Sequence, residues 1–146
     1  MTATFGPVSD YLPHRPPMLL IDHIVEVTDN RAVCRTTIHP DCVFARDGVV
    51  HPSAMIEIVA QACAIWVGVT SSRKGGAPQV GFLVACREVA FAVDRFCIGD
   101  ELTIAVTKVL GEDQLAVFSG IVSRGDEECV TIQLSVVDAE RAGAHA

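Results

Sequence analysis

Two titratable residues stand in apolar surroundings in this sequence: His14 in LPHRPPMLLID and Glu57 in MIEIVAQACAIW. A buried carboxylate without a partner costs several kcal/mol, so Glu57 between Ile56 and Ile58 indicates a working group rather than a solvated surface charge. A neutral imidazole is the natural proton acceptor near neutral pH. The two residues together predict a general base and a general acid.

The segment around His14 is predicted to be a rigid loop. Pro13, Pro16 and Pro17 exclude regular helix and favour an extended path after a short turn at residues 8–12. This composition predicts that His14 is held in one place.

Glu57 is predicted to lie in the first turns of a long helix. Residues 54–71 have the length and the Ala, Ile and Met content of a helix, with Ser53 as the expected N-cap. Gly75 and Gly76 are expected to end it.

Strand-like runs flank this helix on both sides. They are separated by turn signals at 29–30, 99–100, 111–113 and 125–126, and they span residues 19–27, 32–39, 80–93, 101–110, 114–123 and 129–138. A helix that is apolar around most of its circumference must be enclosed. The order therefore predicts an α+β hotdog fold, with one curved antiparallel sheet wrapped around a long central helix.

Composition narrows the possible functions. The 146 residues, half of them apolar, predict one domain spanning residues 1–146, with 139–146 as a disordered tail. A net charge of −7 with 11 Lys and Arg argues against nucleic-acid binding. The N-terminal residues lack signal-peptide features, and the apolar stretch at 54–69 is too short and polar to span a bilayer readily. We therefore expect a cytoplasmic protein without membrane attachment.

Neither the cysteine spacing nor any sequence motif indicates a binding site for a metal or a cofactor. The cysteines lack CxxC spacing and mostly lie in apolar runs, so we expect buried free thiols at Cys34, Cys42, Cys63, Cys86, Cys97 and Cys129. The sequence contains no Gly-rich phosphate loop, metal-ligand cluster or Gly-x-Ser-x-Gly nucleophile elbow.

The ordered blocks LPHRPPMLLIDHIVEV, MIEIVAQACA and GFLVACREVAF resemble the 3-hydroxyacyl-acyl carrier protein dehydratases of the hotdog superfamily. The first block is similar to that family's His-Arg-x-Pro-hydrophobic-Leu-Leu-x-Asp signature, and the second to its Glu-x-x-Ala-Gln helix. The resemblance implies that His14 and Glu57 are the catalytic pair, meeting across a dimer interface. It also implies an acyl carrier protein or coenzyme A thioester as substrate, a homodimer or higher homo-oligomer, and a role in fatty-acid or polyketide-like biosynthesis.

The chain departs from the resembled pattern at the start of the helix. Commoner members have Pro-Gly there, and the glycine N–H holds the substrate carbonyl; the aligned residues here are His51 and Pro52, and proline has no N–H. This departure resembles a divergent branch, such as the predicted dehydratases of specialised lipid or aryl polyene clusters. His51 is expected to cap the helix, with a second titrating group as the alternative.

These residues suggest a mechanism for dehydration. His14 would take the C2 proton of a 3-hydroxyacyl thioester while Glu57 protonates the departing hydroxyl, a role that an apolar setting favours. The amides of Ser53 or Ala54 are the candidate donors to the enolate oxygen. Gln61, one turn after Glu57, could orient its carboxyl group or serve as a helix-to-sheet contact.

Alternative interpretations remain open for each part of this hypothesis. His14 could be an ordinary loop histidine, and Glu57 could form a structural ion pair with Arg15 or Arg87. The chain could instead be a hotdog thioesterase, in which Glu57 activates water, or a noncatalytic acyl-thioester-binding accessory subunit. Candidate walls for an acyl tunnel, which could equally be ordinary core, are Trp66, Phe82, Leu83, Phe91 and Phe96.

Overall fold

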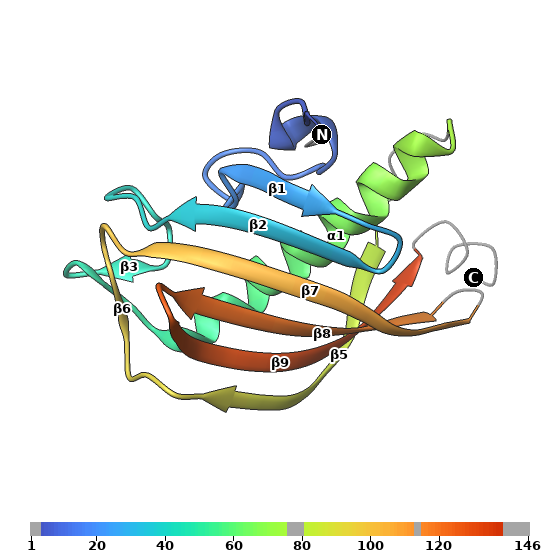
Figure 1. Ribbon diagram of the computed structural model, residues 1–146. Coiled ribbons are helices and arrows are strands. Elements are labelled where there is room, and N and C mark those ends of the chain that lie inside the picture. The colour runs from blue at the N-terminus through green and yellow to red at the C-terminus, as the bar shows by residue number, and fades with distance from the viewer. Residues whose placement is uncertain (1–3, 76–80, 113–114, 139–146) are drawn as a thin grey trace.

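A computed structural model describes residues 4–75, 81–112 and 115–138 (Figure 1). It shows a long helix lying across a curved sheet. In chain order the elements are η1 (Val8–Asp10), β1 (His23–Val27), β2 (Arg31–Thr37), β3 (Ala45–Arg46), β4 (Val49–Val50), η2 (Pro52–Ala54), α1 (Met55–Arg73), β5 (Gly81–Phe91), β6 (Phe96–Cys97), β7 (Glu101–Glu112), β8 (Leu115–Arg124) and β9 (Glu127–Asp138).

The main sheet has six strands in the order β1-β2-β7-β8-β9-β5, and all neighbouring strands are antiparallel. The predicted hairpin between the first two strands is present, closed by the Thr28 N–H donating to the Arg31 carbonyl at 2.8 Å. A second, three-stranded sheet joins β3, β4 and β6. The edges of the main sheet are therefore the short strand β1 and the longer strand β5.

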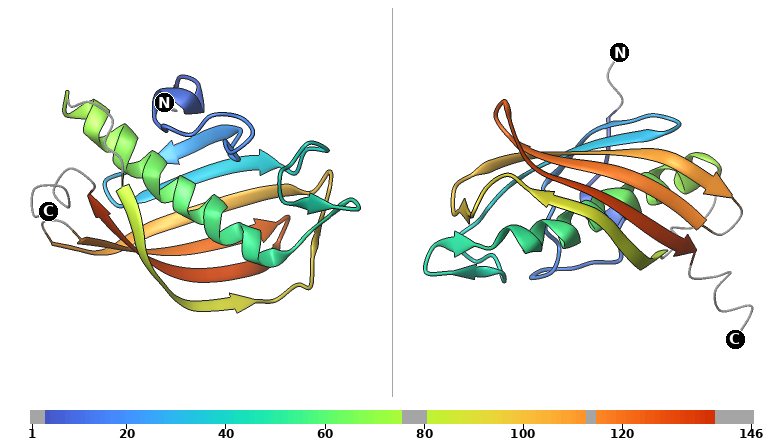
Figure 2. Two further views of the ribbon diagram at one scale, coloured as in Figure 1. Left: turned by 180° about the vertical axis from the view of Figure 1, so that it is seen from behind. Right: turned by 90° about the horizontal axis from the view of Figure 1, so that it is seen from below.

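Helix α1 lies on the concave face of the main sheet (Figure 2). Its buried residues include Met55, Val59 and Ile65, all 0% exposed, which pack with sheet residues such as Phe118 in one core. The helix can lie close to β8 because Gly120 has no side chain: a Cβ there would be 2.5 Å from Val59 Cγ1. The predicted hotdog architecture is confirmed.

The helix ends where the sequence predicts. Gly75 has φ +79°, a conformation that side chains disfavour, and its N–H donates to the carbonyl of Ser72 at 3.0 Å. The start of the helix differs from the prediction. Ser53 is not the N-cap of α1: it lies within η2, which His51 caps, and Ala54 is the N-cap residue of α1 but makes no side-chain capping bond.

Other boundaries also differ from the prediction. The first strand begins at His23 rather than at residue 19, because the Leu20 N–H bonds to the Gln61 side chain instead of to a strand. The two-residue strands β3, β4 and β6 were not predicted from sequence. The predictions for Gly76, residue 80, residues 113–114 and the tail at 139–146 lie outside the described residues.

By length and composition alone, the 22-residue segment Pro52–Arg73 would qualify as a membrane span, contrary to the sequence estimate. Of the 18-residue apolar window in this segment, 56% is buried inside the fold, as expected for a central helix enclosed by a sheet.

All six cysteines are free; Cys34, Cys63 and Cys129 are buried, whereas Cys86 and Cys97 are exposed, contrary to expectation. Burial raises the pKa of Cys34 to about 12 and also raises the pKa of Cys63.

Candidate active site

The loop that carries His14 runs from η1 to β1 and is stabilised by contacts among its own residues and with the core. Leu12 anchors it in the core, where that residue is 2% exposed. The Arg15 guanidinium donates to the carbonyls of Leu12 and His14, both at 2.7 Å. The bond between Pro16 and Pro17 is cis. The predicted rigid path for His14 is thus reinforced by hydrogen bonds as well as by prolines.

Helix α1 touches the start of this loop at Gly68. A Cβ at Gly68 would overlap the carbonyl oxygen of Tyr11 and lie 3.2 Å from its carbonyl carbon. The absence of a side chain therefore lets the backbone preceding His14 rest directly on the helix that carries Glu57.

The structure brings the two predicted catalytic residues together within one chain. His14 Nε2 lies 3.5 Å from Glu57 Oε1, and the two side chains are 31% and 33% exposed. The distance is longer than an ordinary hydrogen bond. The resemblance implied that the two residues come from different protomers, whereas here one chain supplies both. Among the described residues, Glu57 pairs with His14 and not with Arg15 or Arg87.

The Gln61 side chain connects the loop that carries His14 to the helix that carries Glu57. Its side chain is 1% exposed and makes three hydrogen bonds: Nε2 donates to Glu57 Oε1 at 3.0 Å and to the Met18 carbonyl at 2.7 Å, while Oε1 accepts from the Leu20 N–H at 3.0 Å. One amide therefore ties the His14 loop to the carboxylate. The predicted contact with the Glu57 carboxyl is present, whereas the structural contact joins the helix to the loop before β1 rather than to the sheet.

The two ring nitrogens of His14 have different surroundings. Nδ1 is buried and has no hydrogen-bond partner among the described residues, whereas Nε2 faces Glu57. Nε2 is therefore the nitrogen that can exchange a proton with a neighbouring group.

The amides at the start of the helix are already engaged. The Ser53 N–H donates to His51 Nδ1 at 3.1 Å, and the Ala54 N–H donates to the His51 carbonyl at 3.0 Å. The Met55 N–H bonds to carbonyls within η2, and Pro52 has no N–H to offer. The role of Ser53 and Ala54 as oxyanion donors stays a prediction, and each amide would first have to leave its present acceptor.

A cavity of about 400 Å³ opens at this end of the helix. Its lining consists of Phe44, His51, Ser53, Ala54, Ile56 and Glu57. Apolar groups and one carboxylate thus share a space large enough for the head of an acyl thioester, and Glu57 joins this space to His14. Among the described residues no group of three or more His, Cys, Asp or Glu side chains is placed to hold a metal.

The model of one protein family, described as ApeP dehydratase, matches residues 6–145. The chain belongs to the ApeP-like dehydratase family. The contact between His14 and Glu57 therefore lies in a chain of a dehydratase family.

One solved structure agrees with this assignment, and two others share the fold. A chain of the dehydratase heterocomplex ApeI:P from Xenorhabdus doucetiae is 30% identical, covers 92% of both chains and has a TM-score of 0.88. A hypothetical thioesterase with coenzyme A from Streptococcus pneumoniae is 13% identical over 80% of this chain and 87% of that one, with a TM-score of 0.62. The PaaI protein of Escherichia coli is 16% identical over 79% and 81%, with a TM-score of 0.61. The last two share the fold alone. A comparison with curated proteins found no match.

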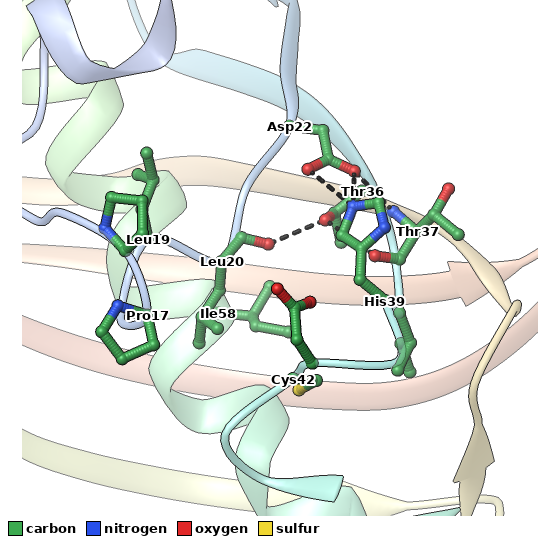
Figure 3. A pocket seen from close by; sticks show the side chains of 12 residues that line it. Pro17, Leu19, Leu20, Asp22, Thr36, Thr37, His39, Cys42 and Ile58 are labelled. Atoms are coloured by element: carbon green, nitrogen blue, oxygen red, sulfur yellow. Dashed lines mark hydrogen bonds and ion pairs between the residues drawn. The ribbon is translucent and has the colours of Figure 1, made fainter. Parts of the chain in front are cut away.

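A second pocket, of about 180 Å³, lies beside the His14 loop of this ApeP-like chain (Figure 3). Asp22 accepts hydrogen bonds there from the Thr37 N–H at 2.9 Å and contacts His39 Nε2 at 3.0 Å, and the Thr36 hydroxyl donates to the Leu20 carbonyl at 2.7 Å. No role was predicted for these residues from sequence. These hydrogen bonds join the C-terminal end of the His14 loop to strand β2.

Three of the predicted tunnel residues, Trp66, Phe91 and Phe96, do not line the cavities formed by the described residues. Phe96 is 0% exposed in the core, and Trp66 packs edge-on against Phe118 and donates to the Thr28 carbonyl. Phe91 is 44% exposed on β5. The side chains of Phe82 and Leu83 lie outside the described part of the structure.

Proposed function

We propose that this chain eliminates water from a 3-hydroxyacyl thioester to give a trans-2-enoyl thioester. The observation that carries the proposal is the 3.5 Å approach of His14 Nε2 to Glu57 Oε1 beside a cavity, in a chain of a dehydratase family. Elimination needs a base at C2 and an acid at C3, and these two side chains are a base and an acid in contact.

The proton balance closes within the pair. His14 takes the C2 proton, the C3–O bond breaks, and protonated Glu57 supplies the proton that turns the leaving hydroxide into water. His14 is then protonated and Glu57 is ionised. Transfer of the proton from Nε2 to Oε1 restores both groups without an outside donor. The reaction is redox-neutral and calls for no cofactor.

The carrier of the acyl group is proposed to be acyl carrier protein, on the strength of the family resemblance. Coenzyme A is the alternative carrier, since a more distant neighbour with this fold is a hypothetical thioesterase with coenzyme A. Turnover of one acyl group presented on each carrier distinguishes the two.

The active assembly is proposed to contain a second hotdog chain. The homodimer expected from sequence is one form of it. The similar Xenorhabdus doucetiae structure is a heterocomplex, which supports a different second chain as the alternative. In both cases one chain contributes the complete His14 and Glu57 pair.

The test follows the intact thioester by mass spectrometry. The full chain, with any subunit that copurifies, is incubated with 3-hydroxyoctanoyl-acyl carrier protein and assayed for loss of water. His14→Asn and Glu57→Gln should each lower the rate by about 10²–10⁴-fold, the usual contribution of a general acid or base. His23→Asn and Glu26→Gln make the same chemical changes at exposed positions on β1 and should leave the rate unchanged.

The other outcomes identify the competing functions. Release of the free 3-hydroxy acid, lost in Glu57→Gln but retained in His14→Asn, would establish a thioesterase, because hydrolysis requires no base at C2. Binding of the acyl thioester without turnover, on either carrier, would establish an accessory subunit.

A further inference from the structure

The proposed elimination places negative charge on the thioester oxygen when the C2 proton leaves. A hydrogen-bond donor aimed at that oxygen is worth about 10²–10³-fold in rate in comparable enzymes. The backbone amides at the helix start are engaged with His51 or with carbonyls of η2, and Pro52 has none. A side chain that reaches the same cavity can supply a donor without breaking any of these contacts.

His51 occupies the required position. It directly precedes Pro52, is exposed, and lines the 400 Å³ cavity together with Glu57, Phe44 and Ile56. Its ring therefore borders the same space as the proposed general acid.

The cap contact determines which ring nitrogen of His51 carries the proton. Nδ1 accepts the Ser53 N–H at 3.1 Å and lies 2.8 Å from the Ser53 hydroxyl oxygen. A backbone N–H can only donate, so Nδ1 must present its lone pair. A neutral imidazole with an acceptor at Nδ1 carries its proton at Nε2. Nε2 has no hydrogen-bond partner within residues 4–75, 81–112 and 115–138.

We propose that the Nε2–H of His51 donates to the thioester oxygen during elimination and so replaces the missing glycine amide. The proposal rests on the function proposed above. As the C2–H bond breaks, its proton goes to His14 and its electron pair forms the enolate, whose oxygen accepts from Nε2–H. The enolate then expels the C3 hydroxyl, which takes the proton of Glu57. His51 keeps its proton throughout and is not consumed.

Two substitutions separate the cap from the donor. In His51→Asn the side-chain oxygen can still accept the Ser53 N–H, since Asn is a good N-cap, but no donor reaches the position of Nε2. In His51→Gln the longer side chain carries an N–H donor to that position. His23→Asn on β1 is the matched surface control.

We expect His51→Asn to lower kcat by about 10²–10³-fold with little change in KM, because the oxyanion exists only in the transition state. His51→Gln should recover to within about tenfold of wild type. A second readout uses octanoyl-acyl carrier protein, which has no C3 hydroxyl to lose. Exchange of its C2 hydrogen with deuterated water should fall in parallel with kcat in His51→Asn.

The inference is overturned if His51→Asn retains wild-type kcat and C2 exchange. It is also overturned if His51→Gln is the slower variant and the loss follows a lower melting temperature, because a purely capping role predicts that order. Absence of both dehydration and exchange in the wild-type assembly would instead refute the proposed function, and this inference with it.

Discussion

At the scale of single residues, the candidate site depends on Gln61 as much as on the proposed reacting pair. His14 and Glu57 come from a loop and a helix that share no local sequence. Gln61 contacts the backbone on both sides of Leu19 and also the Glu57 carboxylate. It is a positioning residue, since it acts on the chemistry only through the groups that it holds.

Replacing Gln61 with methionine should therefore lower both stability and rate. The substitution keeps the side-chain volume but leaves the Met18 carbonyl and the Leu20 N–H without partners, each worth about 1–3 kcal/mol when part-buried. We expect the free energy of unfolding to fall by about 2–4 kcal/mol and kcat to fall further than KM changes. Urea unfolding and steady-state kinetics measure the two effects. Gln133→Met on β9, where the structure gives no side-chain hydrogen bond, is the control; an equal loss there would refute this role.

At the scale of elements, the position of the His14 loop is set by its contact with helix α1. Gly68 allows the Tyr11 carbonyl to lie on the helix. Because the obstacle is backbone rather than a movable side chain, a larger residue at this position must displace the loop or the helix.

Gly68→Ala should consequently destabilise the protein, although alanine favours helix by about 1 kcal/mol. We expect a net loss of about 1–3 kcal/mol from the clash and a lower kcat, since the displaced segment leads to His14. Gly111→Ala is the matched control, because the added methyl there meets only the end of the Lys108 side chain. Thermal unfolding and dehydration assays on both variants test this; a neutral or stabilising Gly68→Ala would contradict the close approach of the loop to the helix.

The packing of α1 on β2 has a consequence for stability at high pH. Burial raises the pKa of Cys34 from 9.0 to about 12, so the folded protein keeps the thiol neutral while the unfolded chain ionises above pH 9. Stability is therefore full below pH 9 and falls as the pH rises toward 12. By pH 10 the loss from this thiol is about 1.4 kcal/mol, and Cys63 on α1 acts in the same direction.

Unfolding free energies at pH 8 and pH 10 measure this effect. The loss between the two should be smaller in Cys34→Ala than in wild type by about 1.4 kcal/mol. Cys97→Ala, at an exposed position, should match the wild-type pH dependence. A wild-type slope in Cys34→Ala would show that the thiol is not buried in solution.

At the scale of the whole molecule, the sheet ends at a long edge strand, β5, which pairs only with β9 among the described residues. β5 has 11 residues, whereas the opposite edge strand β1 has only five. A long exposed edge presents N–H and C=O groups that another strand can satisfy. This supports pairing of β5 with a second hotdog chain.

We expect sedimentation to give a species heavier than the 15.6 kDa chain, either a homodimer or a complex with a different subunit. Hydrogen exchange locates the interface: β5 amides should become protected as the concentration of the partner rises, while β1 amides serve as the internal control and stay unchanged. A single-chain mass with unprotected β5 at every concentration, with and without copurified subunits, would contradict this assembly.

The sequence by itself determined the hotdog class, and it also gave the two residues proposed here as the reacting pair. Those features are local: an apolar helix of fixed length needs an enclosing sheet, proline spacing stiffens the His14 loop, and glycine ends the helix at Gly75. Only the tertiary structure decided that one chain brings His14 to Glu57, because that distance depends on Gln61 and Gly68 joining segments far apart in sequence. The helix start was predicted only in part: a short 3-10 helix, η2, capped by His51, precedes α1, and this arrangement depends on where the side chains of His51 and Ser53 point.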